Sequence, residues 1–298
     1  MASLRDIKTR IESVKSTKQI TNAMKMVAAS KLRKAQDRIV QARPYANHIN
    51  DILSILKYKN SASIHPLLQN AEEGKKNALV VVTSDRGLCG AFNSIVLRKA
   101  TSYLKEHPET EVICIGKKGA DFMSKHHDKV IENYVNLFNE MNFSVSKDVA
   151  SFLLDLYLEK GYGRIDVLYN EFKSAIQQNL TIKPILPITP YIPAAIEDPK
   201  EDEAGGDDSE VTTLDYIYEP DEDTIIEELG VKYINVEVWR IMLESSASEQ
   251  GARMTAMDSA TENAAEMIDK LVLTYNRIRQ AGITKEIIEI ASGAEAIK

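Results

Sequence analysis

The fold is decided by residues 4–56, which read LRDIKTRIESVKSTKQITNAMKMVAASKLRKAQDRIVQARPYANHINDILSIL. From Leu4, alternating steps of three and four residues reach sixteen positions, and thirteen of these are apolar or alanine. The steps amount to a 3.5-residue repeat, which predicts one long helix in a left-handed coiled coil. At about 1.5 Å per residue such a helix is roughly 85 Å long, with a kink expected at Pro44.

The repeat is interrupted between residues 18 and 25. The positions of the repeat are polar here: Lys18, Thr21 and Lys25. Apolar or alanine residues stand beside them instead, at Ile20, Ala23, Met24 and Val27. Two interpretations remain open. In the first, the seam shifts through a stutter and the charges are simply solvated. In the second, the helix faces another protein here as well as its coiled-coil partner.

A second long helix is predicted at the other end of the chain. From Ala247 to Ile278 the same step meets mainly apolar, alanine and threonine side chains. The expected helix runs from about Asp221 to Ala296, some 114 Å at the standard rise. With segments 1–58 and 221–298 both helical, an antiparallel coiled-coil hairpin is the natural arrangement.

The middle of the chain, residues 77–218, has a different pattern. Short β-rich runs alternate with helical stretches, which predicts an α/β domain with a Rossmann-like, mainly parallel sheet inserted between the two terminal helices. The expected strands are 79–83, 111–115, 165–169, 181–188 and 214–218, and the expected helices are 92–107, 117–126 and 146–160. Prolines, two glycines and many acids make residues 190–210 an expected mobile, acidic loop.

Charge is distributed unevenly along the chain. The net charge is −7, yet residues 1–43 carry eleven Lys or Arg against three acids, and residues 197–228 carry fifteen acids against one Lys. A basic first helix is compatible with a solvated face, with nucleic acid or with an acidic protein partner. Aromatic interleaving is absent and the whole chain is acidic, so no nucleic acid is expected. No apolar run approaches 18 residues, so any membrane link is expected to pass through partner proteins.

The segment Thr83 to Gly90, TSDRGLCG, lies where a dinucleotide domain carries its phosphate loop. Neither G-x-G-x-x-G nor G-x-x-x-x-G-K-[ST] is present. Gly87 and Gly90 are therefore expected to form a tight turn and a close helix contact. Cys89, beside Arg86, is a candidate for a lowered thiol pKa, but no matching His and Asp accompany it. We expect no active site, no cofactor and no metal.

Three stretches resemble one protein family. Residues 11–31, IESVKSTKQITNAMKMVAASK, resemble the first helix of the γ subunit of bacterial F-type (F1Fo) ATP synthases. Residues 83–90 are similar to that family's central-domain motif, with Asp85, Arg86, Gly87, Cys89 and Gly90 in the turn. Residues 283–296 match its signature I-T-x-E-x-x-[DE]-x-x-x-G-A-x-[SAKR] at the end of the chain. The signature positions are Ile283, Thr284, Glu286, Glu289, Gly293 and Ala294.

The resemblance implies a central rotor shaft without catalytic residues of its own. One copy would stand inside an α3β3 hexamer and contact the ε subunit and the c-ring of Fo. Proton flow would turn the shaft, which would drive ATP synthesis on the β subunits and regulate ATPase activity and proton flow. The location implied is peripheral, at the cytoplasmic face of the bacterial plasma membrane.

The resemblance also implies particular contacts with β. Met24, with Lys18 and Lys25 nearby, matches positions that lie close to an acidic loop of β. Arg279 and Gln280 match positions that meet a β catch loop. The acidic loop at residues 196–210 departs from the shorter members of the family, and its role stays open.

Two other functions are compatible with part of the pattern. A coiled-coil tether with an α/β head would share the heptads but not all three family motifs. A nucleotide-dependent enzyme would use the central domain, and a binding titration with the purified chain would reveal it.

Overall fold

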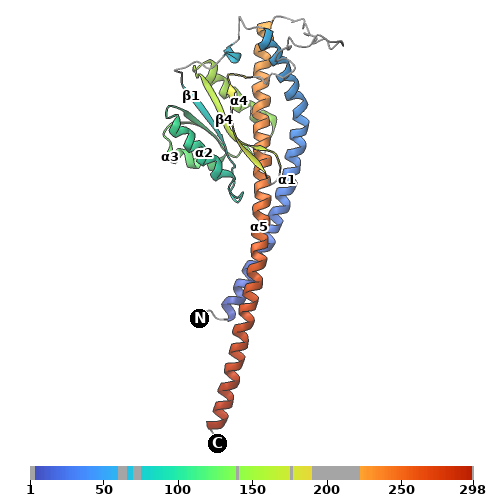
Figure 1. Ribbon diagram of the computed structural model, residues 1–298, viewed down its shortest axis with the longest axis vertical. Helices are drawn as coiled ribbons and strands as arrows, with labels where there is room; N and C mark the ends of the chain where they lie inside the picture. The colour runs from blue at the N-terminus through green and yellow to red at the C-terminus, as the bar shows by residue number, and fades with distance from the viewer. Residues whose placement is uncertain are drawn as a thin grey trace, which may run out of the picture.

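The computed structural model describes residues 4–59, 66–69, 75–138, 141–174, 177–189 and 222–296. Two long helices lie antiparallel, and an α/β domain is attached to one side of the hairpin, as Figure 1 shows. In chain order the elements are α1 (Leu4–Lys59), the 3-10 helix η1 (Pro66–Leu68), β1 (Asn77–Val82), α2 (Phe92–Glu106), β2 (Glu111–Ile115), α3 (Lys117–His126), β3 (Val130–Tyr134), α4 (Phe143–Leu158), β4 (Arg164–Phe172), β5 (Gln178–Leu186) and α5 (Glu222–Ala296). The predicted fold class is confirmed. In Figure 1, α1 curves around α5 and continues through Pro44 as one helix.

The sheet has the strand order β3-β2-β1-β4-β5. β1 to β4 are parallel, and β5 pairs antiparallel with β4. β3 was not predicted from the sequence, because it is a five-residue edge strand whose side chains are only half-buried or exposed. The predicted start of α4 is three residues too late, because the helix is capped by Asn142, whose Oδ1 accepts a hydrogen bond from the Val145 amide at 3.0 Å. The expected strand at 214–218 and the acidic loop at 190–210 lie outside the described residues.

The sheet packs against helices on both faces. Leu79 and Val81 of β1 point toward α2 and α3, whereas Val80 and Val82 point toward α4 and both long helices. The larger core includes the end of α1 and many side chains of α5 between residues 226 and 242. The domain and the hairpin therefore share one core, which holds the α/β domain firmly to the two long helices.

The coiled-coil seam of α1 follows the predicted repeat. Of the sixteen positions counted from Leu4, all but Lys18 are buried or half-buried. Leu32, Ala35 and Ile39 of α1 pack with Leu243 and Ala247 of α5, beside Met141 and Phe172 of the α/β domain. Small alanine side chains alternate here with large aliphatic ones, which lets two helices approach closely while still filling the seam.

The predicted coiled-coil hairpin does not extend along the whole of α5, which is the longer of the two helices, as the sequence predicts. Thr21 lies opposite Thr261 and Lys25 opposite Asp258, so the first described residue of α1, Leu4, lies near Ile278. The remaining eighteen residues of α5 continue without α1, about 27 Å at the standard rise. Figure 1 shows this end of α5 projecting beyond the N-terminus.

Candidate interaction surfaces

A polar layer occupies the seam at the point where the repeat loses its apolar residues. Thr21 Oγ1 and Thr261 Oγ1 are 2.7 Å apart, and Lys25 Nζ forms an ion pair with Asp258 Oδ1 at 2.5 Å. The interpretation that the seam shifts through a stutter is therefore wrong for Thr21 and Lys25, which stay in register. Their polar groups are satisfied across the helix pair, so the seam tolerates them without changing its geometry.

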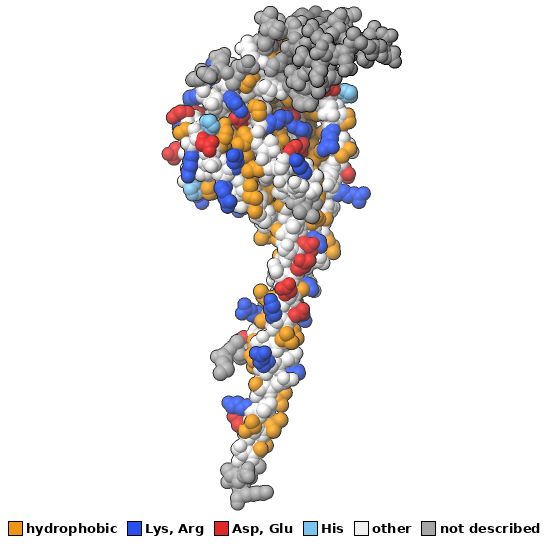
Figure 2. All heavy atoms as spheres, viewed as in Figure 1, with side chains coloured by type: hydrophobic (Ala, Val, Ile, Leu, Met, Phe, Trp, Pro, Cys, Tyr) orange, Lys and Arg blue, Asp and Glu red, His pale blue; other side chains and the backbone are white. Residues whose placement is uncertain are grey.

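The apolar residues beside this layer remain on the outside of the hairpin. Ile20 and Val27 are each 57% exposed, Met24 is half-buried and Lys18 is exposed. Unless another protein covers them, these apolar side chains face water. Figure 2 shows Lys and Arg side chains scattered among apolar ones along the shaft below the domain.

The C-terminal end of α5 exposes several large apolar side chains. Ile283, Ile287 and Ile290 are 50%, 60% and 73% exposed, and Ile288 lies between them at 58%. The resemblance-based contact residues Arg279 and Gln280 are exposed, as are Thr284, Glu286, Glu289 and Gly293 of the signature. Ala294 lies within α5, but its side chain is outside what the structure describes.

Asp85 joins the ends of three parallel strands. Its Oδ1 accepts hydrogen bonds from the amide of Lys117 at 2.9 Å and of Asn136 at 2.8 Å, and its Oδ2 from the amide of Phe138 at 3.3 Å. These amides follow β2 and β3, while Asp85 follows β1. The carboxylate thus occupies the place where a phosphate would sit in a dinucleotide domain, and it uses the first amide of α3.

The rest of the turn is also engaged within the protein. The Ser84 hydroxyl donates to the carbonyl of Arg86 at 2.6 Å, and Asn93 Nδ2 donates to Ser84 Oγ at 2.8 Å and to Cys89 Sγ at 3.3 Å. Burial raises the pKa of the Cys89 thiol despite these hydrogen bonds and the nearby Arg253. The suggestion of a lowered pKa is therefore wrong, since desolvation of the thiolate outweighs the neighbouring cations. Gly90 takes a positive φ of 58° where the turn meets Ala256 of α5.

Arg253 on α5 connects this turn to the helical hairpin, a contact that was not predicted from the sequence. Its Nη2 donates to the carbonyls of Arg86 at 3.3 Å and of Gly87 at 3.2 Å. The same guanidinium pairs with Glu249 at 2.7 Å, one helical turn away. Two further bonds tie β4 and β5 to α5: Ser248 Oγ donates to the carbonyl of Asn170, and Gln178 Nε2 donates to the carbonyl of Ser248, each at 3.0 Å.

A buried cluster of charges forms a second junction between α5 and the sheet. Glu237 pairs with Lys183 of β5 at 2.6 Å and with Arg240 at 2.7 Å. Glu244 lies 3.6 Å from Arg240, and its second carboxylate oxygen has no hydrogen-bond partner among the residues that the structure describes. Charges spaced at 237, 240 and 244 lie on one face of a helix. This spacing is the only sign of the cluster in the sequence, and it does not predict that Lys183 of β5 belongs to it.

Within the described ranges, no group of His, Cys, Asp and Glu could hold a metal ion. No described helix is long and apolar enough to cross a bilayer.

Comparison with known proteins identifies the family. A family model described as ATP synthase matches residues 3–297. The chain is 46% identical to the "ATP synthase gamma chain" of Chloroherpeton thalassium, covering 100% of this chain and 99% of that protein. The chain belongs to the ATP synthase gamma chain family. A second family member, from Geotalea uraniireducens, is 45% identical over the whole of both chains.

Solved structures of the gamma chain family's complexes share the fold. A chain of the Tetrahymena thermophila mitochondrial ATP synthase central stalk and c-ring is 26% identical, with a TM-score of 0.60, covering 81% of this chain and 99% of that one. A chain from the Euglena gracilis mitochondrial ATP synthase has a TM-score of 0.65 at 23% identity, covering 99% of this chain and 94% of that one. Together these likenesses confirm the recognition that the three sequence motifs provided.

Proposed function

We propose that this chain is the central rotor shaft of an ATP synthase, a subunit that transmits torque and has no active site of its own. Its membership of the gamma chain family supports this function, and so does the likeness to a central-stalk chain. The rotation of the shaft would couple proton flow to the conformations of the catalytic sites, which lie on other subunits.

The bare end of α5 is the observation that carries the proposal. An isolated helix is marginal in water, because most helical stability in proteins comes from packing of an apolar face. Here a single helix continues beyond α1 with four isoleucines at least half exposed, at positions 283, 287, 288 and 290. Such a surface is covered in the working state of a protein. A surrounding ring of subunits would cover every side of the helix, as a shaft requires.

The partners follow from the same arrangement. We propose an α3β3 hexamer around the hairpin, with Lys18, Met24 and Lys25 facing β near the polar layer and with Arg279 and Gln280 facing β near the tip. The α/β domain would stand outside the hexamer and contact the ε subunit and the c-ring. The chain would then be peripheral, at the cytoplasmic face of the membrane. Scattered Lys and Arg suit a rotating surface, because exposed ion pairs are individually weak and exchange easily.

Replacement of Met24 by lysine tests the proposed contact with β. The half-buried Met24 borders the polar layer formed by Lys25 and Thr261. We expect Met24→Lys to lower the number of protons pumped per ATP hydrolysed, because it adds a cation to a crowded contact. The stability of the shaft should change by only about 0.5 kcal/mol, as for most surface substitutions. Proton pumping and ATP hydrolysis are measured together in vesicles that contain the assembled complex.

Met26→Lys is the matched control, because Met26 is 63% exposed and lies on another side of α1. Equal loss of coupling in both variants would contradict a specific contact at Met24. Unchanged coupling in Met24→Lys would do the same.

Purification of the native complex through this chain tests the function itself. The shaft proposal expects α and β to be recovered in threefold excess over this chain. Recovery of other proteins alone would favour the coiled-coil tether instead.

A further inference from the structure

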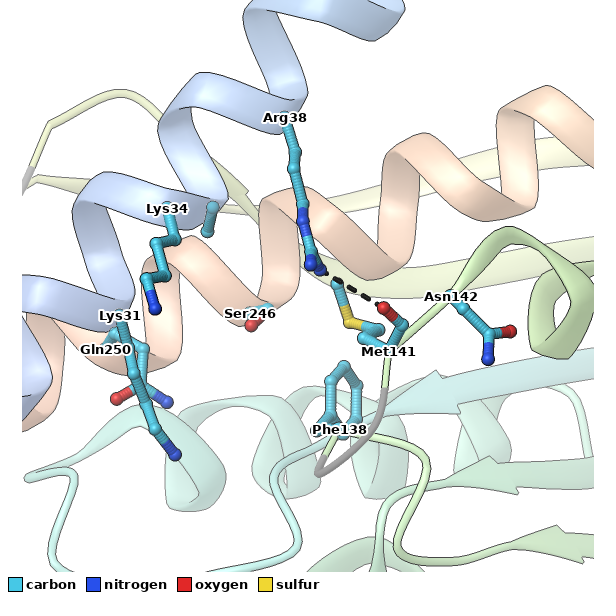
Figure 3. A pocket seen from close by; sticks show the side chains of 9 residues that line it. Lys31, Lys34, Arg38, Phe138, Met141, Asn142, Ser246 and Gln250 are labelled. Atoms are coloured by element: carbon cyan, nitrogen blue, oxygen red, sulfur yellow. Dashed lines mark hydrogen bonds between the residues drawn. The ribbon is translucent and has the colours of Figure 1, made fainter.

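A pocket of about 430 Å³ lies where α1, α5 and the turn before α4 meet. Figure 3 shows Lys31, Lys34 and Arg38 projecting into it from α1, with Ser246 and Gln250 on α5 behind them. Phe138 and Met141 form the wall on the side of the α/β domain. This volume lies within the range of small-molecule sites in proteins.

The pocket is lined by three cationic side chains, and its other polar side chains, Asn142, Ser246 and Gln250, can each donate a hydrogen bond. Arg38 Nη1 donates to the carbonyl of Met141 at 3.1 Å, which fixes the guanidinium at one end and leaves its other donors free for a ligand. Lys31 lies within electrostatic range of Glu249, but that carboxylate is already paired with Arg253. No carboxylate belongs to the lining residues that the structure describes. Three positive charges therefore converge on one concave site whose described lining carries no carboxylate.

Gln250 lines the pocket from the side of α5. The residue is only 8% exposed, yet it reaches the pocket, and its side-chain amide makes no hydrogen bond within the described part of the chain. The amide is therefore available to donate to a ligand that enters the pocket. The hydroxyl of Ser246 stands beside it in the same recess. The two groups give a guest polar contacts behind the lysines.

We infer that this pocket binds a phosphate-type oxyanion, either inorganic phosphate or the phosphate group of a nucleotide. Lys31 and Lys34 supply charge at the mouth, Arg38 supplies a forked donor at one end, and Gln250 and Ser246 complete the contacts inside. A phosphate carries up to two negative charges and four oxygens, which matches three cations and several donors better than a single carboxylate does. An extended acidic peptide would run along the surface and would not reach the recessed Gln250. This site is separate from the shaft function and from the proposed contacts with β.

Phosphate binding to the purified full-length chain is the direct test. Isothermal titration is run with inorganic phosphate, with ATP and with a glutamate-rich peptide at a constant ionic strength of about 0.15 M, where exposed charges are screened beyond about 8 Å. We expect saturable phosphate binding that Lys34→Gln weakens about tenfold, since a hydrogen bond to a charged group is worth at least that factor. Gln250→Leu, which keeps the side-chain size, should weaken binding as well.

Arg33→Gln is the matched control, because it removes the same charge from the neighbouring residue, which is exposed and outside the pocket. Its affinity should equal that of the wild type. Tighter binding of ATP with the same dependence on Lys34 would identify a nucleotide as the source of the phosphate, and binding of phosphate alone would identify the free anion. Equal weakening by Arg33→Gln, binding of the peptide only, or no binding at all would each overturn the inference.

Discussion

Asp85→Ala is expected to destabilise the full-length chain by about 3–5 kcal/mol, because three backbone amides lose their acceptor together. The carboxylate of Asp85 accepts from the amides of Lys117, Asn136 and Phe138, which lie beyond the ends of β2 and β3. The side chain is largely buried, so water cannot replace the lost bonds without opening the turn. Urea unfolding of the purified chain, followed by circular dichroism, measures the loss.

The effect should reach the shaft as well as the domain. The turn that contains Asp85 also provides the carbonyls that Arg253 of α5 binds. We therefore expect amide hydrogen exchange to rise at residues 117 and 136 and also near residue 253 in the variant. Asp121→Ala is the control, since Asp121 is an exposed acid on the adjoining α3 and should change stability by no more than about 0.5 kcal/mol. A loss in Asp85→Ala as small as in this control would contradict the role of the carboxylate.

The helices of this fold could be predicted well because their signal is local. A 3.5-residue repeat is visible in the sequence of each of the two long helices, and the buried positions of α1 follow it. The register through Thr21 and Lys25 could not be predicted in the same way. Those residues keep their seam positions because Thr261 and Asp258 satisfy them, and these partners lie more than 230 residues away in the chain.

The same distinction applies to the central turn. Its position after the first strand was predicted from the sequence. Its function as a junction was not, because the partners of Asp85 and the contact from Arg253 depend on tertiary folding. Cys89 was misjudged for a related reason: the neighbouring arginine is visible in the sequence, whereas burial of the thiol is not.

The repeat alone does not show that the C-terminal end of α5 extends beyond α1. The spacing of apolar residues up to Ile278 indicates a partner helix, and α1 provides it. Beyond that point the isoleucines continue, but α1 has ended. Only the length difference between the helices, together with the register at Thr21, shows that the tip extends beyond α1 and has no helix beside it in the described part of the chain.

Glu237 and Glu244, one heptad apart on α5, are expected to respond in opposite ways to the same substitution. Burial by itself raises the pKa of Glu237, but Arg240 and Lys183 outweigh it and hold the pKa below its ordinary value. Burial also raises the pKa of Glu244, and there Arg240 at 3.6 Å does not compensate. The surroundings therefore stabilise the charged form of Glu237 and destabilise the charged form of Glu244.

Glu237→Gln should destabilise the chain by about 3 kcal/mol at pH 7, because Lys183 and Arg240 lose the charge that neutralises them. Glu237 stabilises the fold above its unfolded pKa of about 4.3, and that contribution is lost as the pH falls through the lower folded pKa.

Glu244 has the reverse sign: the folded state binds its proton more tightly, so stability falls as the pH rises from about 4.3 through the folded pKa. Glu244→Gln should then be more stable than the wild type at pH 8, with a gap that narrows on acidification. Urea unfolding of both variants between pH 4 and pH 8 measures these differences, and a loss of stability in Glu244→Gln equal to that in Glu237→Gln would contradict the assignment of opposite roles.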